Sequence, residues 1–360
     1  MPDVDPLLAA DTAIWIRDGS PYWYLSDDIQ LNWAGSGGPA GAGPDQAGVN
    51  PGDVNKLKVT VRNRAPGLAS GSHGARVELW VCIPGPTLAP GINSTRIIND
   101  LVAAGSLPTG GSFDYTSDWT VNSADPNQAG GHHCLIARVW DQHLTPDADP
   151  NSFHSITDDD HAAQRNITIL TVSAGGKSKS SSGVQHLGGN KWSFKIGIPN
   201  PDRARARQIT VRMLNDSAVD PKLQKFIQRQ LATQPNRVKV TRFGGVLPSF
   251  GLQPLAGTIR TIDNTKVSVL VTTVSRASQL PVINLLPIKV GPKLTTIIPA
   301  PFNPIKQAHF DAELTVPPHA LQLMDVSVDL SKTPVGGAVV THIFQNDPPG
   351  AMVVVWVKAP

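Results

Sequence analysis

The chain of 360 residues is 40% apolar and 16% charged, and it contains 32 glycines and 32 prolines. An apolar content this high is that of a folded protein and excludes extensive disorder. The length fits two or three domains. Because Gly and Pro break helices and mark turns, this composition favours many short strands over long helices.

The net charge of +3 conceals a contrast along the chain. Residues 1–172 hold 9 Lys and Arg against 19 Asp and Glu, a net −10, whereas residues 173–360 hold 22 against 9, a net +13. Such a contrast can mark a part that binds a polyanion, and it can also make two copies attract head to tail. Two modules joined late in evolution would show the same contrast with no functional cause.

Residues 1–20 are expected to form an N-terminal arm with one candidate strand at residues 12–17. The arm is either a loose terminus or a strand added to a neighbouring subunit. It has no basic segment followed by a continuous apolar segment, so no signal peptide is predicted. No run approaches the roughly 20 apolar residues that span a bilayer. We therefore expect a cytoplasmic protein, one exported without a cleaved leader, or a mature form.

Residues 21–172 show the pattern of a β-sandwich. In residues 56–64 (KLKVTVRNR) and 75–83 (ARVELWVCI), apolar and polar side chains alternate with the two-residue period of a half-buried strand. Residues 131–141 (GHHCLIARVWD) form a short apolar run that we interpret as a central strand. Residues 96–104 are expected to form one or two helical turns. Further strands are expected at residues 21–31, around Phe113 and Tyr115, and at residues 163–172.

The order of these strands resembles a known family. The segments are VTVRNR (59–64), VELWVC (77–82), Trp119, GHHCLIAR (131–138) and AQRNITI (163–169). Together they resemble the immunoglobulin-like modules of the bacterial cell-adhesion-related (CARDB-like) type, over roughly residues 20–172. The resemblance implies an immunoglobulin-like sandwich with an interaction role, and it does not imply an enzyme.

Residues 173–190 (SAGGKSKSSSGVQHLGGN) have the composition of a flexible linker and are the expected domain boundary. Strand patterns resume after it, and residues 220–231 carry a helix signal with an N-terminal Asp-Pro. Residues 281–304 are rich in proline and are expected to be an edge strand or an extended loop. The predicted fold class is all-β, with two tandem immunoglobulin-like β-sandwich domains at residues 21–172 and 191–360, the second carrying one short helix insertion. The strands expected in the second domain are residues 192–198, 208–214, 237–243, 266–274, 310–316, 326–330, 338–344 and 352–357.

Cys82 and Cys134 are the only cysteines, and each lies on a predicted strand. Two thiols are too few for a disulfide framework. If the strands are neighbours, the pair can form a cross-strand disulfide, provided that the Cα atoms come within about 7 Å. The alternative that we favour is two small buried thiols. Neither is expected to be a nucleophile.

A group of histidines and aspartates lies near the two ends of the central strand and in the loop that follows it. Such side chains can bind Ca²⁺ or Zn²⁺, but none of them has a recognised ligand spacing. Asp-rich loops also form turns through side-chain to backbone hydrogen bonds, and we favour that interpretation, so no metal ligand is predicted. The residues concerned are His132, His133, His143, His154, His161, Asp141, Asp147, Asp149, Asp158, Asp159 and Asp160.

Two further groups could contact a partner. Arg203, Arg205 and Arg207 would share one face of an extended segment, where they would either protect a sheet edge or bind carboxylates or phosphates. Nucleic-acid binding is not expected, because no aromatics are interleaved with them. The second group consists of aromatic residues that would either stack on sugars or close the end of a core. Its members are Tyr22, Trp23, Tyr24 and Trp33.

No catalytic, cofactor-binding or metal-binding residue is predicted, because the common catalytic motifs are absent from the sequence. The leading hypothesis is a non-catalytic interaction or assembly protein that self-associates head to tail through its acidic and basic halves. The alternative is a carbohydrate- or cell-surface-binding adhesion module. Both rest partly on the resemblance of fold, and fold alone does not fix function.

Overall fold

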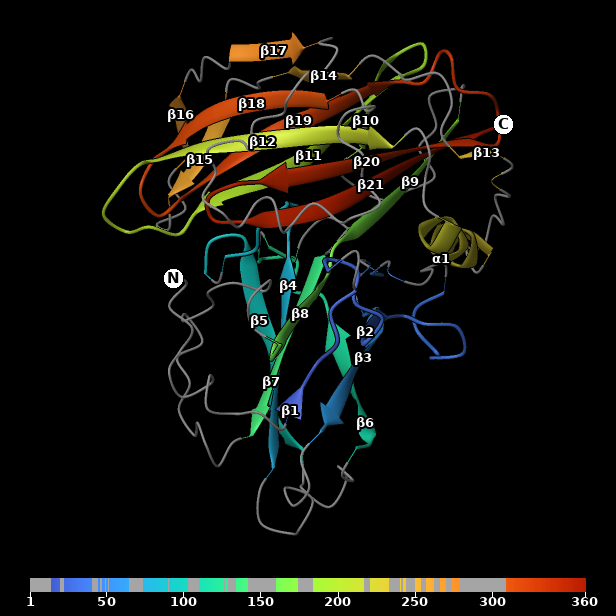
Figure 1. Ribbon diagram of the computed structural model, residues 1–360, viewed down its shortest axis with the longest axis vertical. Coiled ribbons are helices and arrows are strands. Elements are labelled where there is room, and N and C mark those ends of the chain that lie inside the picture. Colours follow the sequence, from blue (N-terminus) through green and yellow to red (C-terminus); the bar gives the residue numbers. More distant parts are fainter. Residues whose placement is uncertain are drawn as a thin grey trace. The chain divides into compact units, whose positions relative to one another are not determined.

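The computed structural model confirms an all-β fold with several sheets and one helix (Figure 1). The chain divides into two compact units. Unit 1 comprises Met1–Cys82, Ser94–Ala129 and His133–Arg165, and unit 2 comprises Ile83–Asn93, Gly130–His132 and Asn166–Pro360. The residues that the structure describes are 14–19, 23–40, 45, 47–48, 50, 52–64, 74–89, 91–102, 110–125, 127–128, 134–141, 160–173, 184–216, 221–232, 240, 242–243, 250–253, 257–261, 266–269, 274–278 and 309–360.

Unit 1 contains two antiparallel sheets. In sheet A, β6 pairs along one edge of β3, so β1 and β2 share the other edge. In sheet B the strand order is β5-β4-β7-β8, which makes β7 an internal strand as expected. The strands of sheet A are β1 (Ile14–Trp15), β2 (Ile29–Leu31), β3 (Val54–Asn63) and β6 (Ser112–Thr120), and those of sheet B are β4 (Ala75–Cys82), β5 (Ser94–Val102), β7 (Cys134–Asp141) and β8 (Ala162–Arg165).

The core of unit 1 is built by the alternation that the sequence shows. Every second side chain of β3, β4 and β7 is buried in one apolar cluster with Ile29, Leu31 and Ala163. A two-residue period places these side chains on one face of each strand, where burial of apolar surface stabilises the pair of sheets. The core residues on the three strands are Leu57, Val59 and Val61, then Val77, Leu79 and Val81, then Leu135, Ala137 and Val139.

One local prediction in unit 1 is wrong. Of the segment expected to be helical, residues 96–102 belong to strand β5, which pairs with β4 along its whole length with a bulge between Leu79 and Trp80. Hydrogen bonding to β4 and burial of Ile98 outweigh the weak helical pattern of this short segment. Within the candidate strand at residues 12–17, Ile14–Trp15 forms strand β1, which pairs with β3. Residues 1–13 of the arm lie outside the described residues.

Unit 2 also contains two large sheets. Sheet C has the order β17-β18-β12-β20-β21-β9, with β13 beside β20, and sheet D has the order β10-β11-β19-β15-β16, with β14 beside β19. A shared apolar cluster includes Trp192, Phe194, Val326 and Trp356. The strands are β9 (Ile167–Ser173), β10 (Val184–Gly188), β11 (Lys191–Asn200), β12 (Arg207–Asp216), β13 (Arg242–Phe243), β14 (Phe250–Gln253), β15 (Gly257–Thr261), β16 (Lys266–Val269), β17 (Val274–Ser278), β18 (His309–Val316), β19 (Ala320–Asp329), β20 (Gly337–Gln345) and β21 (Gly350–Ala359).

Helix α1 (Pro221–Ala232) confirms the predicted helix to within one residue. Leu223, Phe226, Ile227 and Leu231 are buried, as their helical spacing indicates. No helix in the described part of the chain is long and apolar enough to cross a membrane. The proline-rich segment 281–304 lies outside the described residues.

The compact units divide the chain at a different place from the expected linker. The longest segment of unit 2 begins at Asn166, and β9 belongs to sheet C through its parallel pairing with β21. In the expected linker, residues 174–183 lie outside the described residues, whereas Val184–Gly188 forms strand β10. Only Asn166 separates β8 of unit 1 from β9 of unit 2.

Asn166 ties several segments of unit 2 together. Its side-chain amide Nδ2 donates to the backbone oxygen of Gly85 at 2.9 Å and to that of Ala351 at 2.7 Å, and the side chain is fully buried. Residues 83–93, which connect β4 to β5, thereby join unit 2. The amide of Gly197 donates to the Pro84 oxygen at 2.7 Å, and a Cβ atom at Gly85 would collide with the Gly197 oxygen, so the backbones approach as only glycine permits.

We predict that Asn166→Ala destabilises unit 2 by about 2–4 kcal/mol, because two buried carbonyl groups lose their donor. Hydrogen-exchange mass spectrometry of peptides from β9 and β21 measures this change. Gln208→Ala is the matched control, since it removes an exposed side-chain hydrogen bond to Thr315 and is expected to change stability by less than about 0.5 kcal/mol. Equal effects of the two variants would contradict the role assigned to Asn166.

Candidate binding surface

The side of sheet A that faces away from the core carries the most structured group of polar and aromatic side chains on unit 1. We call it the outer face of sheet A and define it by Trp15, Arg17, Asp28, Trp33, Lys56, Lys58, Arg62, Arg64, Asp114 and Asp118. Because strands alternate, the residues of β3 between Leu57, Val59 and Val61 project to this face. Strand β3 therefore contributes side chains both to the core and to the outer face of sheet A.

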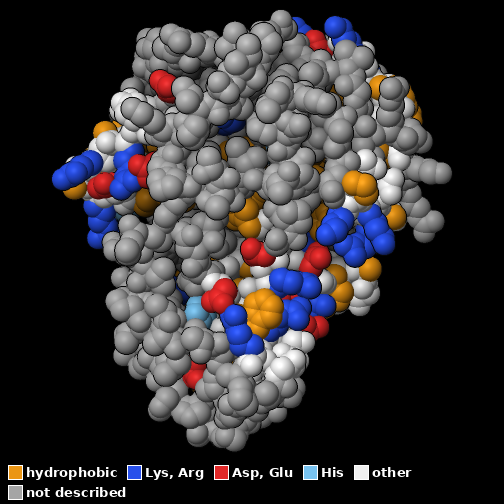
Figure 2. Space-filling model, in the orientation of Figure 1, with side chains coloured by type: hydrophobic (Ala, Val, Ile, Leu, Met, Phe, Trp, Pro, Cys, Tyr) orange, Lys and Arg blue, Asp and Glu red, His pale blue; other side chains and the backbone are white. Residues whose placement is uncertain are grey.

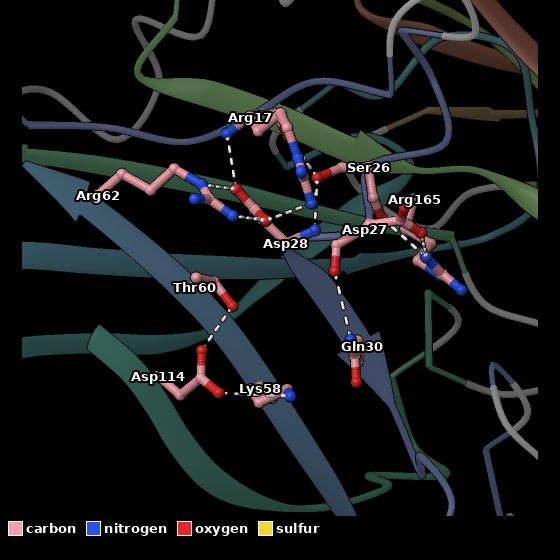
Figure 3. A network of polar contacts seen from close by, with 10 residues as sticks. All are labelled: Arg17, Ser26, Asp27, Asp28, Gln30, Lys58, Thr60, Arg62, Asp114 and Arg165. Carbon is pink, nitrogen blue, oxygen red and sulfur yellow. Dashed lines mark hydrogen bonds and ion pairs between the residues drawn. The ribbon is translucent and has the colours of Figure 1, made fainter. Parts of the chain in front are cut away.

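Asp28 is the fixed centre of this face (Figure 3). Its carboxylate is only 2% exposed, and it accepts hydrogen bonds from Arg62 Nε at 2.6 Å and Arg62 Nη2 at 2.7 Å. It also accepts from the backbone amide of Arg17 at 3.0 Å and from Arg17 Nη2 at 3.1 Å. A buried carboxylate is stable only when charged donors surround it in this way. The hydrogen bond to Asp28 raises the pKa of Arg62.

Asp28 is itself positioned by its neighbours in sequence. Its backbone amide donates to Ser26 Oγ, and the Ser26 hydroxyl donates to the backbone oxygen of Arg17 at 2.6 Å. The backbone oxygen of Asp28 accepts a hydrogen bond from the backbone amide of Thr60 on β3 at 2.8 Å. This turn is therefore fixed to both β3 and the segment after β1.

Trp15 forms an aromatic platform beside this network. The guanidinium carbons of Arg62 and Arg64 lie 5.6 and 5.0 Å from the centre of its ring, within the range of cation–π attraction. The two arginines differ in accessibility: the Arg62 side chain is 26% exposed, and that of Arg64 is 46% exposed. Arg64 pairs with Asp160, which is also exposed, whereas Arg62 is held by buried Asp28.

A second aromatic–cation pair lies further along β3. The ammonium group of Lys58 is 5.3 Å from the ring centre of Trp33 and 3.4 Å from Asp114 Oδ2. Lys56 pairs with Asp118 across the β3–β6 ladder at 2.7 Å. Figure 2 shows basic and acidic side chains gathered around hydrophobic ones on one part of the surface. Because Asp114 and Asp118 are more than half exposed, these pairs add little stability.

The aromatic group predicted from the sequence is divided by the structure. Trp23 and Tyr24 are buried and pack edge to face, with ring centres 5.3 Å apart, so their rings are not available to stack on a sugar. Tyr22 lies outside the described residues. Trp33 is on the outer face of sheet A, and Trp15 was missed, although the alternation of TAIWIR, with Ile14 and Ile16 buried, could have placed it there.

The arginine run does not form the predicted row on one extended face. Arg203 lies in a bend, and only Arg207 belongs to β12. Arg207 pairs with Asp202 at 3.2 Å and with Asp347, so its charge is neutralised within unit 2. The carboxylate of Asp202 accepts hydrogen bonds from the backbone amides of Ala204 and Arg205, and these bonds lower the pKa of the group. Arg203 and Arg205 remain exposed.

The histidine- and aspartate-rich group is described only in part. Asp141 ends β7 and is buried, His161 is buried, and Asp160 is exposed and lies 3.5 Å from His161 Nδ1. Among the described residues, no three His, Cys, Asp or Glu side chains are arranged to hold a metal ion. The members that lie outside the described residues are His132, His133, His143, His154, Asp147, Asp149, Asp158 and Asp159.

The outward side of sheet B also carries charges, but they are enclosed. Glu78 receives two bonds from Arg138, at 2.7 and 3.0 Å, and one from Arg96 at 2.6 Å. The Arg138 guanidinium lies 5.5 Å from the ring of Trp80 and 4.8 Å from that of Trp140. Arg138 and Glu78 are each about 1% exposed, so this cluster is structural. Cys82 and Cys134 lie directly opposite each other on β4 and β7, and both are buried.

Comparison with known proteins gives no family for this chain. No family model matches it, and no curated protein matches it. Among solved structures, it is similar to CfaE, the adhesive subunit of the CFA/I fimbria of enterotoxigenic Escherichia coli, with 7% identity, a TM-score of 0.17, and coverage of 98% of this chain and 95% of that one. A mutant of CfaE gives 8% identity, a TM-score of 0.16, and coverage of 98% and 94%. Similarity this low carries no argument about function.

We predict that Asp28→Asn destabilises unit 1 by about 2–3 kcal/mol, because Arg62 and Arg17 lose their charged acceptor while the site stays buried. Faster hydrogen exchange in peptides from β3 would report the loss. Asp114→Asn is the matched control: it removes an exposed charge from the same face and is expected to cost less than about 0.5 kcal/mol. If Asp28→Asn behaved like this control, Asp28 would not be the centre of the surface.

Proposed function

We propose that the protein is a non-catalytic binding protein of the adhesion type, and that the outer face of sheet A contacts its ligand. The observation that supports this most directly is the pairing of Trp15 with Arg62 and Arg64 on a surface fixed by the buried Asp28. Aromatic and arginine side chains dominate the energetics of binding surfaces. A rigid platform also loses little conformational entropy on binding.

The ligand class that suits this chemistry is a carbohydrate bearing an acidic group. The partly exposed indole rings of Trp15 and Trp33 offer apolar surface for a sugar ring. Arg64 can exchange Asp160 for a ligand carboxylate or sulfate, because an exposed ion pair is weak and a guanidinium binds such groups through two parallel bonds. Arg17, with a side chain that is 49% exposed, offers a second such donor.

We expect the wild-type protein to bind acidic glycans on an array. We expect Trp15→Ala and Arg64→Gln each to lower the affinity about 10- to 100-fold, a loss of the size that removal of a charge-assisted contact causes. Arg205→Gln is the matched control, because it removes an exposed arginine on unit 2 and should bind normally. Circular dichroism would establish that each variant folds. The absence of binding to any glycan by the folded wild-type chain would contradict the proposed ligand class.

The charge contrast along the chain supports a second candidate function, head-to-tail self-association or binding to a protein partner. Residues 1–172 carry −10 and residues 173–360 carry +13, so the acidic part of one copy attracts the basic part of another. A contact of this kind between different surfaces of two copies produces rings or filaments.

We predict that any such assembly weakens as the salt concentration rises. The Debye length, over which charges attract each other, falls from about 30 Å at 0.01 M to about 3 Å at 1 M ionic strength. Sedimentation velocity at both ionic strengths measures it. The expected result is a larger species at low salt that dissociates at high salt. A monomer under both conditions, at concentrations up to about 100 μM, would exclude self-association and leave the glycan proposal standing.

A further inference from the structure

Cys82 and Cys134 occupy directly opposed positions on neighbouring strands. The register of β4 and β7 runs without a shift from Ala75 opposite Asp141 to Cys82 opposite Cys134. Directly opposed residues of an antiparallel pair point to the same face of the sheet. Their Cα atoms lie about 4.5 or 5.5 Å apart, depending on the type of pair, and both values fall within the range of about 4.4–6.8 Å that a disulfide requires.

Both side chains are completely buried. Burial raises the pKa of the Cys82 thiol well above its ordinary value, and the proximity of Cys134 raises it further. The thiolate is the form that reacts in disulfide exchange. A thiol that is both inaccessible to an oxidant and protonated at neutral pH reacts very slowly in the folded protein.

We propose that Cys82 and Cys134 are a site of covalent cross-linking, in which a disulfide forms between β4 and β7 during folding in an oxidising medium and does not form once unit 1 has folded. The strand pairing brings the two cysteines together, whereas the burial of both side chains in the folded protein excludes the oxidant. The redox condition at the moment of folding therefore decides which form persists.

The oxidant is a small-molecule disulfide such as oxidised glutathione. The first cysteine thiolate attacks one of its sulfur atoms and releases one glutathione thiolate. The second cysteine thiolate then attacks the mixed disulfide, forms the protein S–S bond and releases the second glutathione. The two protein thiols lose two protons and two electrons in total, and one oxidised glutathione is reduced to two molecules of glutathione.

The bond would close a loop of about 50 residues that contains β5 and β6. Cross-linking stabilises a fold chiefly by restricting the unfolded chain, and a loop of this length lies in the range where the effect is large. For a unit of this size, we expect the melting temperature of unit 1 to rise by about 5–15 °C.

The test compares two routes with the full chain. In the first, denatured and reduced protein is refolded in a mixture of oxidised and reduced glutathione. In the second, reduced protein that is already folded is incubated with the same mixture for the same time. Thiol titration under denaturing conditions and peptide mapping without reductant then report the state of Cys82 and Cys134.

We expect a Cys82–Cys134 cross-linked peptide and no titratable thiol after the first route, and two titratable thiols after the second. Correctly folded protein that keeps both thiols after the first route, or carries only mixed disulfides with glutathione, would overturn the proposal. Rapid cross-linking by the second route would overturn the part that assigns control to burial. The double variant Cys82→Ala/Cys134→Ala is the control, since its melting temperature should be the same whether it is refolded with or without oxidant.

Discussion

The two faces of strand β3 lie in different environments, one in the apolar core and one among charged side chains. The rest of unit 1 depends on the register that keeps each face in its own environment. Leu57, Val59 and Val61 anchor the core on one side. On the other side, Arg62 is bound to the buried carboxylate of Asp28, which fixes the turn before β2 to the sheet. A shift of one residue in register would exchange the two faces and place Lys56, Lys58 and Arg62 in the core, where unpaired charges are strongly unfavourable. The same constraint thus sets the register and orients the surface.

The two charged faces of unit 1 illustrate how burial decides the role of similar chemistry. On sheet B, Arg138 and Glu78 are enclosed between Trp80 and Trp140, and they specify the packing of β4 and β7. On sheet A, Arg62 is held in the same manner by buried Asp28, but Arg64 is exposed and forms its ion pair with exposed Asp160. The free energy that holds an exposed pair is small, so it can be exchanged for a ligand. This difference is why the proposed binding surface lies on sheet A.

The sequence determined the strands with strong alternation, namely β3, β4, β11 and β12, because a two-residue period needs no knowledge of the partner strand. It determined β7 from a short apolar run with polar residues at both ends. It also determined helix α1, whose apolar spacing and N-terminal proline are local signals. It did not determine β5, where the segment has little local preference and pairing with β4 decides the conformation. Nor did it show that the change from unit 1 to unit 2 occurs at Asn166, since that depends on hydrogen bonds to Gly85 and Ala351.

The same division holds for the candidate site. The sequence by itself determined that Lys56, Lys58 and Arg62 share one face of a strand, and that aromatic residues lie near the N-terminus of the domain. Only the tertiary structure decided that Trp33 reaches that face while Trp23 and Tyr24 are buried, and that Asp28 comes between Arg17 and Arg62. Alternation is a property of one strand and can be found in its residues. Which segments meet, and which side chains remain exposed, depends on contacts between residues far apart in the chain, which no local pattern encodes.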